Sequence, residues 1–200
     1  MERCELDELH YIAPISSIVS ISSLGILSHQ KARRVQHESV AMEVIQDRRA
    51  KIVVPNARLL HEYANLYFCA RNPMLFKRQD LHESLCVLRV SPSVLDLKGV
   101  VIADRNASSD HVRFAAAPEG LRIVDRALVF AEYWTDPNEI QQFKKRSAKC
   151  AEVLVPDRVD PRYLMGASVS CQESLKRFNE LGVGLQARID QHMFFFSERP

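Results

Sequence analysis

The chain has 200 residues, of which 46% are hydrophobic and 26% charged, and its formal net charge at neutral pH is +2. This balance is ordinary for a globular protein, so we expect a single domain over residues 1–200 with a sizeable core. The small net charge excludes binding through overall basicity, so any contact with nucleic acid would need a local basic patch.

Cysteine usage and the absence of long apolar segments indicate the compartment. The five cysteines are odd in number and no pair has C-x-x-C spacing, which argues against a disulfide framework and against a zinc knuckle. No apolar run is long enough to cross a bilayer, and the acidic N-terminus lacks the apolar stretch of a signal peptide. We therefore expect a soluble, cytoplasmic protein with no membrane partner.

Periodicity and capping residues predict alternating short elements. In chain order we first expect a strand at 9–12, a helix from Pro14 to a cap at Gly25, a polar loop at 30–40 and a short helix at 41–49. A strand at 66–69 and a helical turn begun by Asn72-Pro73 follow. We then expect a strand at 84–90, a turn begun by Ser91-Pro92 and a strand at 100–103.

The second half is read in the same way. We expect a small-residue loop at 104–117, helical residues around 119–131 and a helix capped by Asp136 with Pro137 at its first position. Strands are expected at 151–155, 164–169 and 185–190. Between the last two strands, a Ser170-x-x-Glu173 capping box would begin a helix that ends near Gly182. Strands and helices mix without regular alternation, which favours an α+β fold with a mixed sheet over a doubly wound one.

Common catalytic motifs are missing. His61-Glu62 begins a zinc-protease pattern, but Asn65 stands where the second histidine ligand is needed. There is no G-x-G-x-x-G, no Walker loop and no G-x-S-x-G elbow, and only six glycines are present. The common hydrolase, dinucleotide-fold and P-loop interpretations are therefore excluded.

Four segments carry a family resemblance. They are His10 in the first strand, the run Gln46-Asp47-Arg48-Arg49, segment 60–76 (LHEYANLYFCARNPMLF) and segment 151–155 (AEVLV). In this order they resemble the DarT family of DNA ADP-ribosyltransferase toxins over roughly residues 9–190, and segment 60–76 is the most specific. The resemblance implies an α+β ADP-ribosyltransferase fold: a split, mixed β-sheet with surrounding helices that clamps NAD⁺, the co-substrate, with no metal.

The resemblance also implies catalytic residues. Breaking the nicotinamide–ribose bond builds positive charge on the ribose, and Glu152 would stabilise that charge and take a proton from the incoming base. Arg49 would hold the NAD⁺ phosphates and support base activation, with its neighbour Arg48 as the alternative register. Without the family pattern, Glu152 would be read as a solvated acid and Arg49 as a favourable charge at a helix end.

The resemblance implies five cofactor-binding residues besides Arg49. His10 matches a strand histidine that bonds the NAD⁺ ribose, and its neighbours Tyr11 and Ile12 would line the nicotinamide. Leu27 would pack on the adenosine side, and Tyr67 would stack on nicotinamide or on a base. On residues alone, His10 would be read as a satisfied core histidine and Leu27 as core packing, and core packing is also the alternative for Tyr67.

The nucleic-acid contacts are expected on three segments. Arg71 would contact a phosphate, and Met74 would wedge against an unstacked base. Asn106 lies in the loop that would read the target base. A basic cluster on the helix before Glu152 would position phosphates or simply form a solvated face: Lys144, Lys145, Arg146 and Lys149.

Two departures from the family pattern bear on the base. Thymine-modifying members often carry T-D-x-H before the long loop, where this chain has Asn106 in place of the histidine. This change favours guanine, the target of another branch, over thymine. Ile12 replaces the usual threonine after the strand histidine, so only backbone contacts could survive there.

The leading hypothesis is a toxin that ADP-ribosylates a base in single-stranded DNA, because a base must be unstacked to react. The family also implies an antitoxin partner with ADP-ribosyl-hydrolysing activity. Two alternatives stay open: transfer to RNA or protein, and a non-enzymatic nucleic-acid-binding module on a degenerate transferase fold.

Overall fold

The computed structural model describes residues 1–35, 49–54 and 58–196. The strands of this part of the chain are β1 (Leu9–Pro14), β2 (Ile26–Leu27), β3 (Tyr63–Tyr67), β4 (Leu85–Val90), β5 (Val101–Ala103), β6 (Phe114–Ala116), β7 (Glu152–Pro156), β8 (Arg158–Val159), β9 (Leu164–Val169) and β10 (Ala187–Ile189). The α-helices are α1 (Ile18–Leu24), α2 (His29–Ala32), α4 (Pro73–Phe76), α5 (Arg126–Val129), α6 (Glu139–Ala148) and α7 (Gln172–Glu180).

Short 3₁₀ turns connect these elements, at Arg3–Glu5, Ile15–Ser17, Leu60–Glu62, Gln79–Ser84, Pro92–Asp96, Glu119–Ile123 and Pro161–Tyr163. None of the described helices is both long enough and apolar enough to cross a lipid bilayer.

One eight-stranded sheet organises the molecule, in the order β10-β9-β4-β1-β3-β7-β5-β6. Its neighbouring strands are antiparallel except β9 and β10, which are parallel, so the sheet is mixed as predicted. A separate two-stranded sheet joins β2 to β8. The α+β class is therefore confirmed, whereas the single-domain organisation over residues 1–200 stays a prediction.

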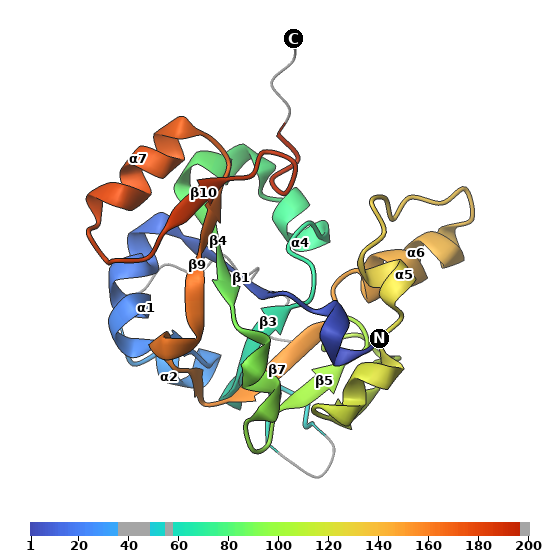
Figure 1. Ribbon diagram of the computed structural model, residues 1–200. Helices are drawn as coiled ribbons and strands as arrows, with labels where there is room; N and C mark the ends of the chain where they lie inside the picture. The colour runs from blue at the N-terminus through green and yellow to red at the C-terminus, as the bar shows by residue number, and fades with distance from the viewer. Residues whose placement is uncertain (36–48, 55–57, 197–200) are drawn as a thin grey trace.

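The sheet is split where β1 meets β3. Along its other edge β1 pairs with β4 over six positions, but towards β3 it pairs only at His10 and Tyr67. Beyond that pair the two strands part, which leaves one half formed by β10, β9, β4 and β1 and another formed by β3, β7, β5 and β6. In Figure 1, α1 and α7 lie on the side of β9 and β10, and α5 and α6 lie at the opposite end, beyond β5.

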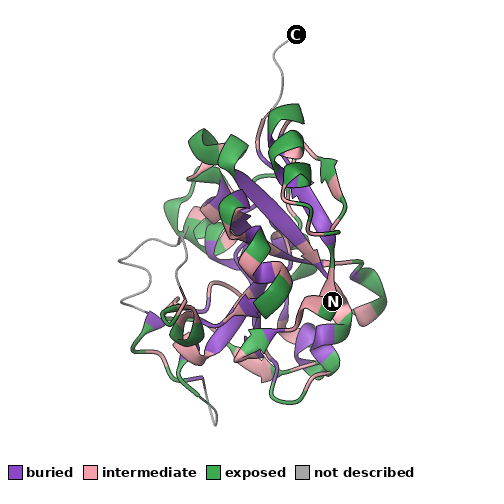
Figure 2. Cartoon of the chain, turned by 90° about the vertical axis from the view of Figure 1, so that its left-hand side faces the viewer, coloured by how far each residue is buried: buried purple, intermediate pink, exposed green. Residues whose placement is uncertain are grey.

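The core follows the strands, as Figure 2 shows by the buried residues concentrated in the sheet beneath exposed helix surfaces. Leu88 of β4, Ile18 of α1 and Phe178 of α7 belong to one continuous apolar cluster. A second cluster packs Ile12 of β1 and Tyr67 of β3 against the C-terminal segment. Four of the five residues of β7 are buried, because this strand lies between β3 and β5.

Most of the predicted elements form where local chemistry is strong. β9 has the predicted bounds, and β4 and β7 each begin one residue later than expected. Asn72 caps α4 by accepting bonds from the backbone N–H groups of Met74 and Leu75, with Pro73 at the first position. Gly25 ends α1 at φ +84°, where an added Cβ would lie 2.1 Å from a backbone oxygen of β8.

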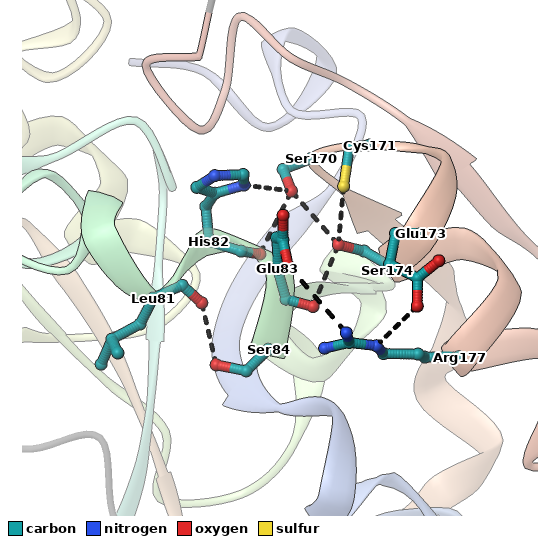
Figure 3. Close-up of polar contacts among 9 residues, drawn as sticks. All are labelled: Leu81, His82, Glu83, Ser84, Ser170, Cys171, Glu173, Ser174 and Arg177. Atoms are coloured by element: carbon teal, nitrogen blue, oxygen red, sulfur yellow. Dashed lines mark hydrogen bonds and ion pairs between the residues drawn. The ribbon is translucent and has the colours of Figure 1, made fainter.

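Two predicted helix starts are wrong. α6 is capped by Asn138 and not by Asp136, because the Asn138 side chain accepts bonds from two backbone N–H groups while Asp136 is bonded to Lys145. Ser170 does not cap α7, which begins at Gln172. The Ser170 hydroxyl lies instead 2.8 Å from Nδ1 of His82 and 3.3 Å from the Ser174 hydroxyl. Both contacts are drawn in Figure 3.

Two predicted loops contain regular structure. β6 lies within residues 104–117, where it pairs with β5, and α2, capped by Ser28, extends to Ala32, inside the segment expected to be polar loop at 30–40. Of the helix predicted at 41–49, only Arg49 falls among the described residues, so Arg48 and the rest of that helix lie outside them.

Candidate active site

Glu152 begins β7 at the centre of the second half-sheet. It is opposite Tyr67 of β3 on one side and Ala103 of β5 on the other, and its side chain is fully buried. A strand held on both edges fixes the backbone of this residue. A buried carboxylate is costly unless its oxygens are bonded, so its partners decide what the site can do.

Those partners are Arg49 and a loop amide. Nη1 and Nη2 of Arg49 donate to Oε1 and Oε2 of Glu152 at 3.0 and 3.1 Å, and the backbone N–H of Ala107 donates to Oε1 at 2.9 Å. Burial lowers the pKa of Arg49, but the charge and hydrogen bonds of Glu152 outweigh burial and raise that pKa above its usual value. The pair is therefore a fixed, charged unit.

The loop that supplies the Ala107 amide is itself held at both ends. The buried carboxylate of Asp104 accepts bonds from the backbone N–H and Nε of Arg113 at 2.9 and 2.8 Å, and it also pairs with Arg105. The backbone N–H of Asn106 donates to the Ser147 carbonyl at 3.1 Å. These bonds tie the loop to β6 and to the end of α6, which places Ala107 against Glu152.

A cavity of about 470 Å³ lies at the split in the sheet. Its walls come from both halves, with Tyr11 to Pro14 of β1 on one side and Asn65 and Tyr67 of β3 on the other. This volume is typical of a small-molecule site. Seven of the residues predicted for the site line this cavity: Tyr11, Ile12, Leu27, Arg49, Tyr67, Met74 and Asn106.

Glu152 lies behind the cavity wall. Arg49, which is 6% exposed, lines the cavity and covers the carboxylate. Burial, followed by the nearby Glu152 charge, raises the pKa of Tyr67 well above its usual value, so its phenol is protonated and neutral. Arg49 and the phenol of Tyr67 thus belong to the cavity wall, whereas the acid that they adjoin does not.

His10 lies at the junction of the two half-sheets and not on the cavity wall. Burial, followed by the charges of Arg188 and Arg89, lowers its pKa to about 4, so the ring is neutral near pH 7. Glu8, 3.9 Å away, does not reverse this shift because its carboxylate already pairs with both arginines. Nδ1 of His10 is buried with no hydrogen-bond partner among the described residues.

The residues expected to contact nucleic acid are divided between three places. Met74 and Asn106 line the cavity, but Arg71 lies over the Phe195 ring in a separate groove. Lys144 is exposed on α6, and Lys145 pairs with Asp136 at 2.7 Å.

Lys149 does not belong to a basic face, so that part of the predicted cluster is wrong. Its side chain is 1% exposed, and Nζ donates to the backbone carbonyls of Val129 and Ala131. Arg146, by contrast, lines the cavity.

Sequence reasoning missed several lining residues. Asn65 was considered only as a missing zinc ligand, yet it alternates with Tyr67 along β3 and points to the same side. That period of two was the available signal. Lys77 and Arg78 line the cavity from the turn after α4, where no periodic signal marks them. Among the described residues, no group of three His, Cys, Asp or Glu side chains is placed to hold a metal.

A family model described as "ssDNA thymidine ADP-ribosyltransferase, DarT" matches residues 10–195 of the chain. The chain belongs to the DarT family. This description agrees with the predicted enzyme class, a DNA ADP-ribosyltransferase. The family description names thymidine, and nothing in it supports the preference for guanine predicted from Asn106.

Named relatives agree with this membership. The DarT-family chain is 34% identical over 176 residues to a DNA ADP-ribosyl transferase–DNA ADP-ribosyl glycohydrolase fusion protein of Thermosipho africanus, a match covering 83% of this chain and 43% of the relative. It therefore spans less than half of that fusion protein. It is 32% identical over 159 residues to a DNA ADP-ribosyl transferase of Thermus sp. strain 2.9, covering 74% and 73% of the two chains.

Solved structures are similar over almost the whole DarT-family chain. Thermosipho africanus DarTG in complex with ADP-ribose superposes with a TM-score of 0.84 at 27% identity, over 96% of this chain and 52% of that one. Thermus sp. 2.9 DarT in complex with ADP-ribosylated ssDNA gives a TM-score of 0.78 at 26% identity, over 95% and 97%. The predicted ADP-ribosyltransferase fold with a split sheet is confirmed.

Proposed function

We propose that this chain transfers ADP-ribose from NAD⁺ to a base of single-stranded DNA, with Glu152 as the catalytic carboxylate. The observation that carries the proposal is the Arg49–Glu152 pair at the wall of the cavity in the split sheet. The ADP-ribosylated ssDNA bound to the Thermus structure, which is similar over 95% of this chain, supports the choice of acceptor.

The chemistry follows from the charge on each group. Departure of nicotinamide leaves positive charge on the ribose, which the carboxylate of Glu152 would stabilise before receiving the proton of the attacking base. Fixed hydrogen bonds from Arg49 and Ala107 orient that carboxylate, so little reorganisation is needed during the reaction. An arginine has five N–H donors, so two bonds to Glu152 leave donors for an NAD⁺ phosphate.

NAD⁺ would lie between the two half-sheets. Tyr11 and Ile12 would border the nicotinamide end, Leu27 the adenosine end, and the neutral phenol of Tyr67 would pack against nicotinamide or the base. His10 stays in this proposal, because its Nδ1 is buried without a partner among the described residues and a ribose hydroxyl would supply one. The His10 ring would then bond the ribose from the junction of β1 and β3 and not from the cavity wall.

We infer that the base is thymine and not the guanine favoured by the sequence alone. Oδ1 of Asn106 accepts bonds from the backbone N–H and the hydroxyl of Ser108, at 2.9 and 2.7 Å. This leaves the Asn106 NH₂ group, a donor, as the free polar group of this side chain at the cavity lining. A donor fits the carbonyl oxygens of thymine, and it fits O6 of guanine as well, so Asn106 does not require guanine. The thymidine named by the family description agrees.

Biological context extends the proposal to a toxin with an antitoxin that removes ADP-ribose. The Thermosipho africanus relative joins a DNA ADP-ribosyl transferase to a DNA ADP-ribosyl glycohydrolase in one chain, which supports such a partner. All five cysteines are free thiols, which fits the reducing cytoplasm expected from the sequence.

The test uses mass spectrometry of defined oligonucleotides incubated with NAD⁺. One oligonucleotide has a single thymine and no guanine, another a single guanine and no thymine, and RNA and protein acceptors are treated in parallel. We expect an ADP-ribose adduct on the thymine oligonucleotide only. An adduct confined to guanine would reverse the base assignment, and one confined to RNA or protein would reverse the acceptor.

The catalytic role is tested with Glu152→Gln, which keeps the size of the side chain and removes its charge. Transfer should fall by at least about 100-fold. Glu173→Gln, at an exposed glutamate on α7, is the matched control and should transfer normally. Full transfer by Glu152→Gln with intact folding would show that another residue carries the catalytic role.

A further inference from the structure

A second groove lies beside the cavity, between α4, the segment around Trp134 and the C-terminal turn. Three aromatic rings line it and hold one another edge to face. The ring centroids of Phe76 and Trp134 are 5.6 Å apart, those of Phe76 and Phe195 5.1 Å, and those of Trp134 and Phe195 5.7 Å. Phe76 is nevertheless 43% exposed and Tyr133, at the rim, 67%. Such exposure of large rings needs an explanation.

The groove is built and not accidental. The Arg71 guanidinium lies 4.1 Å from the centre of the Phe195 ring, and its Nη1 donates to the backbone carbonyl of His192. Phe195 has φ +60°, a conformation that an aromatic residue adopts only where its surroundings impose it. Phe196 stacks on His82 at 4.7 Å, and Ser170 bonds that histidine ring, as Figure 3 shows.

The groove continues from the cavity across one short helix. Met74, Lys77 and Arg78 line the cavity, whereas Phe76 and Gln79, from the same stretch of chain, line the groove. A strand whose target base enters the cavity past Met74 would therefore cross α4, with two cationic side chains beside it, and reach the three rings.

We propose that this groove stacks bases next to the target base in single-stranded DNA. The proposal rests on the proposed function and deepens it. Aromatic rings with an arginine plane bind the faces of unstacked bases, and any base offers such a face. Glu132 also lines the groove, 3.9 Å from His192, so phosphates are disfavoured inside it and bases are favoured. A duplex would not fit, because its base faces are already stacked.

Trp134 can serve as an intrinsic fluorescent probe of the groove, because it is the single tryptophan of the chain. Single-stranded oligonucleotides are titrated into the full chain without NAD⁺ while tryptophan fluorescence is followed. A short oligonucleotide carries only the target base and its phosphates, and a longer one extends on both sides. We expect quenching by the longer strand alone. Replacing flanking nucleotides with abasic sites should abolish the quenching, although the phosphates remain.

Variants then link the groove to the reaction. Trp134→Ala and Arg71→Ala should weaken binding of the longer, labelled strand by roughly 5- to 100-fold, the effect of losing one base–aromatic stack. Trp134→Phe keeps a ring and should retain most of the affinity. Phe130→Ala is the matched control, because Phe130 is also exposed and also faces an arginine, 5.7 Å from Arg126, but lies outside the groove. Thermal unfolding checks that each variant folds.

The outcomes separate the two proposals. If wild-type protein modifies DNA but Trp134→Ala binds and reacts like wild type on the longer strand, the groove proposal is overturned and the proposed function stands. Equal binding of strands with intact and with abasic flanking nucleotides would also overturn the groove proposal. If no oligonucleotide is ever modified but the longer strand still quenches Trp134, the groove proposal stands and the proposed function fails.

Discussion

Arg49 reaches across 103 residues of sequence to give Glu152 two parallel hydrogen bonds of 3.0 and 3.1 Å. Both side chains are buried, at 8% and 0% exposure. Each charge is therefore balanced chiefly by the other, and the loss of either residue would leave a buried charge without its partner.

Removal of either partner should destabilise the fold, because the remaining charge is left buried and unpaired. We expect Arg49→Ala to lower the free energy of unfolding by about 3–5 kcal/mol. The double variant Arg49→Ala/Glu152→Ala should lose less than the sum of the single variants. Urea denaturation of the four proteins measures this coupling, and strictly additive losses would contradict the proposed pairing.

His10 should make stability depend on pH below neutrality. Its pKa is about 4 in the folded protein and about 6.5 when unfolded, so between these values the unfolded chain binds more protons. Stability is therefore complete above pH 6.5 and is lost on acidification towards pH 4, by up to about 3 kcal/mol. In His10→Gln this part of the slope should disappear. Denaturation midpoints of both proteins, measured across that pH range, test this prediction. An equal slope of stability against pH in His10→Gln and wild type would mean that His10 is protonated in the folded state.

Lys149 should be a structural residue and not a nucleic-acid ligand. Its buried amine donates to the backbone carbonyls of Val129 and Ala131. These bonds connect the end of α5 and the residues after it to the end of α6. Lys149→Met keeps the volume but leaves these carbonyls without a donor, at a cost of about 2–4 kcal/mol of stability. Lys144→Met, on the exposed face of the same helix, should change stability by less than about 0.5 kcal/mol. Equal effects in thermal unfolding would refute the difference in burial.

Asp104 should influence the reaction without touching the substrates. Its carboxylate joins Arg105 and Arg113 and so fixes the loop whose Ala107 amide bonds Glu152. We expect Asp104→Ala to reduce the rate of transfer at saturating NAD⁺ by up to about 100-fold, as small misplacements of catalytic groups do. Asp96→Ala removes an exposed aspartate that also pairs with an arginine, and it should react normally. Equal rates for both variants would show that the loop position does not depend on Asp104.

The sequence was informative where local chemistry or a long motif determines the outcome. The ordered motifs, including the Gln46–Arg49 run and the AEVLV strand, led to Arg49 and Glu152, and the structure brings these two residues together. The Asn72-Pro73 helix start could also be predicted, because the cap and the proline act within one turn.

The failures concern long-range competition. Asp136 and Asn138 are both good caps, but in the structure the Asp136 carboxylate is bonded to the Asn138 backbone N–H and to Lys145, and Asn138 takes the cap. Lys149 follows three cationic residues, and no charge pattern reveals that it turns inward onto Val129. β6 consists of a phenylalanine and two alanines, so its signal is weak until β5 pairs with it.

The single residue pair that joins β1 to β3 has a physiological consequence. The two halves of the sheet share few bonds of their own, so a dinucleotide lying between them would serve as a structural tie. Folding and substrate occupancy are then thermodynamically linked, and the protein gains stability as free NAD⁺ rises above its dissociation constant. Without NAD⁺, such an enzyme would be both idle and less stable, so that its resistance to unfolding would follow the supply of its substrate.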